Sequence, residues 1–182
     1  MLALAACGGG GSGGDTLPTF SSAPASTPPA FLPPTTPAPG VTAPAATRTA
    51  ALGSRLTLTR RDGRSTVDVN ALEAADPADG RPAPPAGTRW VAVRIEISNP
   101  AGPTYTEVPA DASRMIDTDG NVYAAWESDP VRPGFGDDAT IRAGGFVRGF
   151  VAFSVPLNAT PAAFRFTPQQ RTAPDTGEWR LR

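Results

Sequence analysis

The stretch Asp117-Thr118-Asp119-Gly120-Asn121 has the side chains best suited to metal chemistry. Carboxylate and amide oxygens this close together are ligands that calcium prefers, so Asp117, Asp119 and Asn121 form a candidate calcium site. An EF-hand loop has its glycine at the sixth position and a glutamate at the twelfth. Here the glycine is fourth and no such glutamate follows. The same residues are typical of a tight hairpin turn. We expect a turn and keep calcium binding as the alternative.

A second group of carboxylates lies in one segment rich in Gly and Pro, at Glu127, Asp129, Asp137 and Asp138. Paired carboxylates carry out acid–base catalysis in glycosidases. Nothing in the sequence fixes the distances between these four, and acidic residues on such loops are usually solvated. The chain contains no His, which excludes Ser-His-Asp and Cys-His arrangements. We therefore expect no enzymatic activity and no catalytic cofactor.

Aromatic side chains at strand ends and in loops form a third group of candidate site residues. Trp90, Tyr105, Trp126 and Phe135 are candidates for a binding surface, because exposed aromatic residues are enriched at interfaces. The alternative, which is the more frequent role, is that they complete a hydrophobic core. Phe135 is the least core-like of the four because it lies between two glycines, and Trp90 follows because it lies in the polar-facing register of its strand.

Cys7 is the single cysteine of the chain and a candidate for lipidation. The segment Leu4-Ala5-Ala6-Cys7 resembles a bacterial lipobox, and that resemblance implies a diacylglyceryl group on the thiol and a membrane anchor. A signal peptide needs a basic segment and then ~7–15 apolar residues. Only six residues precede Cys7, and none is basic. We interpret residues 1–7 as a truncated lipoprotein signal and expect the true translation start to lie upstream.

Residues 8–49 are rich in Gly, Pro, Thr and Ala. Such a segment cannot bury enough apolar surface to offset the entropy of ordering it, so we expect a disordered spacer. Its reach is at most about 100 Å. The formal net charge of the whole chain is −1, so it has no excess of basic charge to attract nucleic acid. No apolar run approaches the ~18–20 residues that a membrane span needs.

Residues 50–182 contain the strands of the predicted domain. Val91, Val93, Ile95 and Ile97 alternate with mostly polar residues, which is typical of a long strand on a hydrophobic core. Further strands are predicted at 55–60, 66–72, 104–108, 114–116, 122–126, 146–155, 164–166 and 179–181. No segment has a convincing helical period. The sequence therefore predicts an all-β protein, an antiparallel β-sandwich preceded by a disordered tail.

Four of these segments together resemble a known family. They are Leu56–Thr59, Trp90–Asn99, the hairpin Asp117–Tyr123, and Gly149–Pro156 with its Gly-Phe-Val-Ala-Phe-x-Val-Pro pattern. Their order is similar to that of a bacterial immunoglobulin-like domain of unknown function, which recurs in actinobacterial and Gram-positive lipoproteins. That family is related in fold to a secreted immunoprotective antigen of mycobacteria. The resemblance covers roughly residues 50–170 and implies an extracytoplasmic immunoglobulin-like sandwich without known catalytic residues.

We therefore expect a non-enzymatic lipoprotein on the extracytoplasmic face of the bacterial cell membrane. Its anchor is a lipid on Cys7. Its immunoglobulin-like domain is expected to bind an envelope protein or another ligand, and not nucleic acid. The alternatives are an envelope sensor that binds calcium or a small ligand, and an accessory subunit of an envelope complex.

Overall fold

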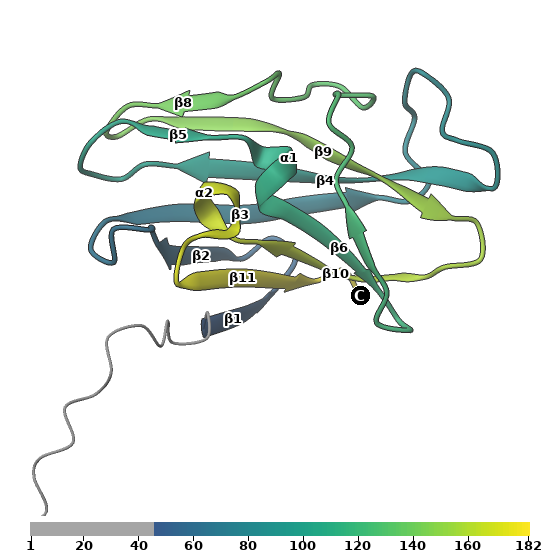
Figure 1. The fold of residues 1–182 in the computed structure, drawn as a ribbon, viewed down its shortest axis with the longest axis horizontal. Helices are drawn as coiled ribbons and strands as arrows, with labels where there is room; N and C mark the ends of the chain where they lie inside the picture. Colours follow the sequence, from purple (N-terminus) through teal and green to yellow (C-terminus); the bar gives the residue numbers. More distant parts are fainter. Residues whose placement is uncertain (1–45) are drawn as a thin grey trace, which may run out of the picture. The chain divides into compact units, whose positions relative to one another are not determined.

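The structure is a computed structural model that describes residues 46–182, and these fold into two stacked β-sheets with a small third sheet (Figure 1). In order across the sheet, the five-stranded sheet contains β1 (Ala46–Ala51), β11 (Asp175–Arg180), β10 (Pro161–Phe166), β6 (Ser113–Asp117) and β7 (Val122–Ala124). The four-stranded sheet contains β2 (Arg55–Thr59), β3 (Thr66–Ala75), β4 (Thr88–Ser98) and β9 (Phe146–Pro156). The third sheet pairs β5 (Tyr105–Glu107) with β8 (Ala139–Ile141).

This architecture confirms the predicted all-β, immunoglobulin-like sandwich, with two differences. Strand β1 runs parallel to β11, so the sheets are not antiparallel throughout. Strand β1 also begins at Ala46, whereas residues up to 49 are predicted from the sequence to belong to the disordered spacer. The prediction failed here because the Thr- and Ala-rich segment 46–49 has little apolar side-chain area of its own. Its backbone groups are instead paired by β11, whose partners lie more than a hundred residues away.

The core lies between the two large sheets and follows the period-two pattern of the sequence. Val91, Val93, Ile95 and Ile97 of β4 are all 0% exposed. Strand β4 pairs along its whole length with β9, from Thr88 opposite Pro156 to Ser98 opposite Phe146. The facing sheet contributes large buried side chains to the same cluster, namely Met115, Phe164, Phe166 and Trp179. The loops that adjoin β4 and β9 are therefore attached to two strands that are paired along their whole length.

Two helices of four residues, α1 (Pro109–Ala112) and α2 (Pro168–Arg171), interrupt the strands at positions where the sequence predicts none. They lie beside each other (Figure 1), and Thr167 donates its backbone N–H to the carbonyl oxygen of Ala112 at 2.9 Å. Within residues 46–182, neither helix has the length or the apolar sequence to cross a membrane.

Candidate functional site

Trp90 and Tyr105 are core residues, which corrects the prediction that they belong to a binding surface. Each is 2% exposed. Trp90 does point to the outer face of the four-stranded sheet, as its register predicts. It is nevertheless covered there, in a small cluster with Ala92, Val131 and Ala152. The cover comes from two loops that are distant in sequence, the β3–β4 loop (76–87) and the β7–β8 loop (125–138).

The β3–β4 loop is held to the sandwich at both its base and its middle. Arg89 of β4 binds both carboxylate oxygens of Asp76, at 2.5 and 3.0 Å, which fixes the start of the loop. The indole Nε1 of Trp90 donates to the carbonyl oxygen of Pro82 at 2.9 Å. Gly80 lies so close to Trp90 that a Cβ there would be 2.7 Å from the indole Cδ1. The conformation of this loop is therefore set by contacts with β4.

The β7–β8 loop is held in the same way against the edge of β9. Trp126 donates its backbone N–H to Ala152 at 2.8 Å, and Phe150 donates to Pro133 at 2.8 Å. Within the loop, the carboxylate of Asp129 accepts the backbone N–H of Gly136 at 2.6 Å. These contacts pair an otherwise free sheet edge, which is a common way of protecting edge strands.

The two loops enclose a groove of about 820 Å³. Its lining residues, which define what we call the two-loop groove, are Asp79, Gly80, Arg81, Ala83, Pro130 and Arg132. The two loops are joined by a hydrogen bond from the backbone N–H of Arg81 to the carbonyl oxygen of Pro130, at 2.8 Å. This volume is within the range of sites for small ligands, ~300–1,000 Å³. The groove is thus an open, braced hollow with charged side chains at its rim.

Trp126 also contacts Trp90, the residue that packs against Gly80 of this groove. Its ring packs edge-to-face on Trp90, with centroids 5.2 Å apart and an interplanar angle of 72°. It is nevertheless 39% exposed and lines a separate hollow of about 380 Å³ with Ala125, Glu127 and Ser128. Trp126 is therefore the predicted aromatic site residue that the structure leaves accessible.

Phe135 is half-buried and packs against the edge of the core. Its ring lies over Gly149 of β9, where a Cβ would be 2.9 Å from the ring carbons. Phe135 thus holds the β7–β8 loop in place, and its role as a binding residue stays a prediction.

The Asp117 turn is built as a hydrogen-bonded hairpin. One carboxylate oxygen of Asp117 accepts the backbone N–H groups of Asp119 and Asn121, at 2.9 and 2.8 Å. The other accepts the side-chain amide of Asn121 and the hydroxyl of Tyr123, at 2.9 and 2.7 Å. Hydrogen bonds from Asn121 and Tyr123 lower the pKa of the Asp117 carboxyl to about 2. A cation at this carboxylate would have to displace these donors.

The other carboxylates of the predicted sites do not converge. Asp119, Glu127, Asp137 and Asp138 are exposed, and Asp129 is engaged by Gly136. Within the described part of the chain, no group of three or more carboxylate or cysteine side chains has the spacing to hold a metal ion. Cys7, the predicted lipidation site, lies outside the described residues.

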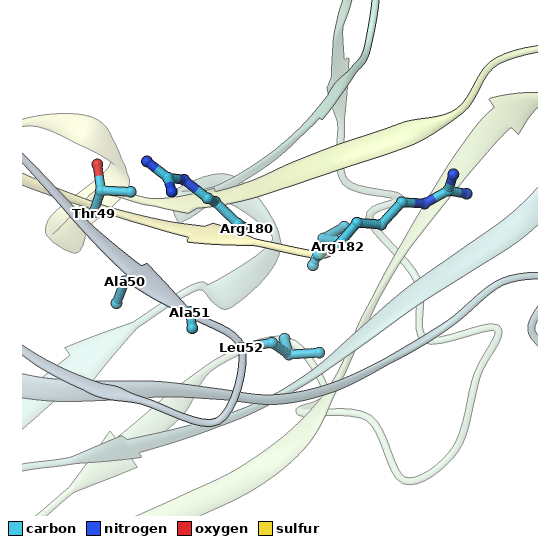
Figure 2. A pocket seen from close by; sticks show the side chains of 7 residues that line it. Thr49, Ala50, Ala51, Leu52, Arg180 and Arg182 are labelled. Carbon is cyan, nitrogen blue, oxygen red and sulfur yellow. The ribbon is translucent and has the colours of Figure 1, made fainter.

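A further hollow of about 550 Å³ lies where β1 and β11 end. It is lined by Thr49, Ala50, Ala51, Leu52, Arg180, Leu181 and Arg182. Figure 2 shows the side chains of Arg180 and Arg182 extending in opposite directions, so the two guanidinium groups do not converge on one point. Its other side chains are small or apolar, and the hollow lacks the convergent polar groups that fix a ligand.

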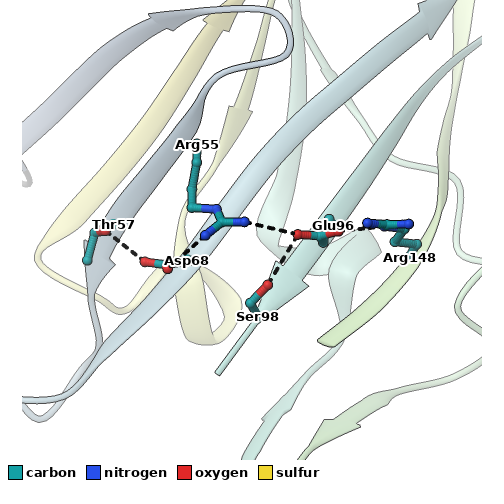
Figure 3. A network of polar contacts seen from close by, with 6 residues as sticks. All are labelled: Arg55, Thr57, Asp68, Glu96, Ser98 and Arg148. Carbon is teal, nitrogen blue, oxygen red and sulfur yellow. Dashed lines mark hydrogen bonds and ion pairs between the residues drawn. The ribbon is translucent and has the colours of Figure 1, made fainter. Parts of the chain in front are cut away.

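Charged side chains on the exposed part of the four-stranded sheet neutralise one another. Glu96 is 7% exposed and lies between Arg55, at 3.6 Å, and Arg148, at 2.5 Å (Figure 3). Arg55 also reaches Asp68 at 3.9 Å, and Asp68 accepts the hydroxyl of Thr57 at 2.7 Å. The charged groups of this network are thus largely paired with one another within the protein.

A buried polar network joins β5 to α2. The guanidinium of Arg60 lies 4.6 Å over the ring of Tyr105, whose hydroxyl donates to Glu107. Glu107 also accepts the backbone N–H groups of Gln169 and Gln170, which have positive φ values of 53° and 54°. Burial raises the pKa of the Glu107 carboxyl, against these hydrogen bonds, which lower it. The carboxylate is needed to hold this unusual turn.

No residue of the two-loop groove is among the site residues predicted from the sequence; the groove is lined by parts of segments 76–87 and 125–138. The two segments share one sequence pattern. Both contain Asp-Pro followed within a few residues by Arg-Pro, at Asp76-Pro77 with Arg81-Pro82 and at Asp129-Pro130 with Arg132-Pro133.

No protein-family model matches the chain, and a search of curated proteins found no match. Three solved structures are similar to it. The secreted protein MPT63 of Mycobacterium tuberculosis is 17% identical with a TM-score of 0.55, over 75% of this chain and 98% of that one. The yjhA protein of Bacillus subtilis is 10% identical with a TM-score of 0.52, over 72% and 98%. An uncharacterized β-sandwich protein of Clostridium difficile is 9% identical with a TM-score of 0.45, over 74% and 94%. At these identities, the similarity to the first two structures shows that this chain shares a β-sandwich fold with those proteins.

Proposed function

We propose that this chain is a non-enzymatic binding protein held on the extracytoplasmic face of the bacterial membrane by a lipid on Cys7. The bound ligand or envelope protein contacts the end of the sandwich that carries the two-loop groove and Trp126. The observation that carries the binding role is the combination of an exposed indole and a braced groove in one region. Loops at one end of a rigid sandwich are a common place for binding residues.

The proposed location has two supports. The first is the lipobox-like segment Leu4–Cys7, followed by a long Gly- and Pro-rich segment. The second is the fold, which is similar to that of a secreted mycobacterial protein. A lipid anchor would keep the domain near the membrane, and the spacer would set the radius within which it meets a ligand. Stable anchoring needs more than one lipid chain.

The location is tested by the mass of the N-terminal peptide. The protein is expressed from its own locus in its own host, and the membrane and cytosolic fractions are separated. The expected result is an acylated peptide that begins at Cys7 in the membrane fraction, and no acylated peptide in the Cys7→Ala variant. An unmodified chain that begins at Met1 in the cytosol would overturn the proposed anchor and location.

A further inference from the structure

The charged groups at the rim of the two-loop groove are of both signs and are not paired with one another. Arg81 and Arg132 carry positive charge and Asp79 carries negative charge, and all three are exposed. Across residues 46–182, none of the three takes part in an ion pair. In contrast, the charged groups of the Glu96 network satisfy each other. The groove therefore offers free hydrogen-bond donors and a free acceptor.

This mixture of groups restricts the chemistry of a ligand. A ligand with charge of one sign would meet a like charge at the rim. A hydroxyl group both donates and accepts hydrogen bonds, so neighbouring hydroxyls can donate to Asp79 and accept from Arg81 or Arg132. Hydrogen bonds to charged groups are also stronger than neutral ones. An uncharged ligand with many hydroxyls suits the groove best.

Trp126 adds an apolar platform beside these polar groups. The face of an aromatic ring is electron-rich, and the C–H groups on the face of a sugar ring are weakly positive, so the two pack together. The ring of Trp126 packs on Trp90, and Trp90 also contacts Gly80 in the groove. One buried indole therefore connects the platform to the groove.

The region is also rigid before a ligand arrives. The hydrogen bonds Trp90–Pro82 and Arg81–Pro130 fix the walls of the groove, and the Asp76–Arg89 ion pair fixes the base of one loop. A site whose backbone is already ordered loses less conformational entropy on binding.

From these observations we infer that the two-loop groove and Trp126 bind an uncharged saccharide chain. One sugar ring stacks on Trp126, and the hydroxyls of further rings bond to Asp79, Arg81 and Arg132. This inference rests on the proposed binding role and names the class of ligand.

The test uses the full chain with Cys7→Ser, which keeps lipid out of the assay. Calorimetry and tryptophan fluorescence are measured with four neutral oligosaccharides: chitohexaose, maltohexaose, cellohexaose and mannohexaose. Hexagalacturonate and inorganic phosphate are the anionic probes. We expect at least one neutral oligosaccharide to bind with a dissociation constant below about 1 mM. We expect Trp126→Ala to weaken that binding at least about tenfold and Asp79→Ala to weaken it several-fold.

Phe146→Ala and Arg180→Ala are the matched controls, because both residues are exposed and line neither the two-loop groove nor the hollow beside Trp126. Both are expected to bind like the parent chain, and circular dichroism confirms that each variant is folded. Binding of none of the four neutral oligosaccharides at about 10 mM would overturn the inference. It would also be overturned if hexagalacturonate or phosphate bound more tightly than the sugars, or if Trp126→Ala had no effect. Since the assay contains no lipid, a failed anchor at Cys7 leaves its outcome unchanged.

Discussion

Asn99, the residue that follows β4, joins four segments of the sandwich through its side chain and backbone. It is 0% exposed. Its side-chain amide donates to the carbonyl oxygens of Pro103 and Ile141, both at 3.0 Å, and its side-chain oxygen accepts a hydrogen bond from Arg60. Its backbone pairs with the turn before β9, where it donates to Gly145 at 3.0 Å. We predict that Asn99→Ala is among the most destabilising single substitutions outside the apolar core.

The size of the effect follows from the groups that lose a partner. Arg60 is 3% exposed, and within residues 46–182 its Nε has no hydrogen-bond partner. Loss of the Asn99 oxygen removes the side-chain acceptor of this guanidinium within those residues and leaves it the carbonyl oxygen of Pro103. A hydrogen bond to a buried charged group contributes about 1.5–3 kcal/mol, and a buried group left unpaired costs about 1–3 kcal/mol. With partial relaxation, Asn99→Ala should lower the free energy of unfolding by about 3–5 kcal/mol. For a domain of this size that corresponds to a fall in Tm of roughly 10–15 °C.

The assay is equilibrium unfolding in urea, followed by tryptophan fluorescence, with the full chain. Asn158→Ala is the control, because Asn158 is exposed in the β9–β10 turn and should change stability by less than about 0.5 kcal/mol. If Asn99→Ala does not fold, Asn99→Asp keeps the acceptor for Arg60. It places an oxygen against the carbonyls of Pro103 and Ile141, and its loss of stability should grow as the new carboxyl ionises. A loss below about 1 kcal/mol for Asn99→Ala would refute this account of the buried network.

Three further predictions concern the core and the Asp117 turn. Gly177→Ala should cost about 1–3 kcal/mol in urea unfolding, because a Cβ there would lie 2.5 Å from the Trp179 ring; an unchanged midpoint would show that the ring moves freely. The folded-state pKa of Asp117 is lowered from 3.8 to about 2, so its contribution to stability is complete above pH 3.8 and is lost as the pH falls towards 2. The difference in urea midpoint between the parent chain and Asp117→Asn should therefore shrink over that window, and a constant difference would contradict the assignment. Because the donors around Asp117 already occupy its oxygens, millimolar calcium should leave the Tm unchanged; a rise that Asp117→Ala plus Asp119→Ala removes would establish the calcium site instead.

The features that depend on neighbouring residues can be predicted from the amino-acid sequence. The alternation from Val91 to Ile97 predicts one buried face, because successive side chains of a strand point to opposite sides. The turn at Asp119-Gly120 is predicted by residue type, and Gly120 has a positive φ value of 84°. The position of Asn99 at the end of its strand is also visible in the sequence, although its partners are not.

Which outward-facing residues are covered depends on contacts between segments that are distant in the sequence. Trp90 is in the outward register of β4, yet two loops separated by about fifty residues along the chain close over it, and Trp126 beside it stays exposed. The groove likewise needs Arg81 and Arg132 to be brought together by a backbone contact between those loops. Strand β1 depends in the same way on β11. These contacts are made between distant segments, so no local period or turn signal encodes them, and the candidate site exists only in the folded chain.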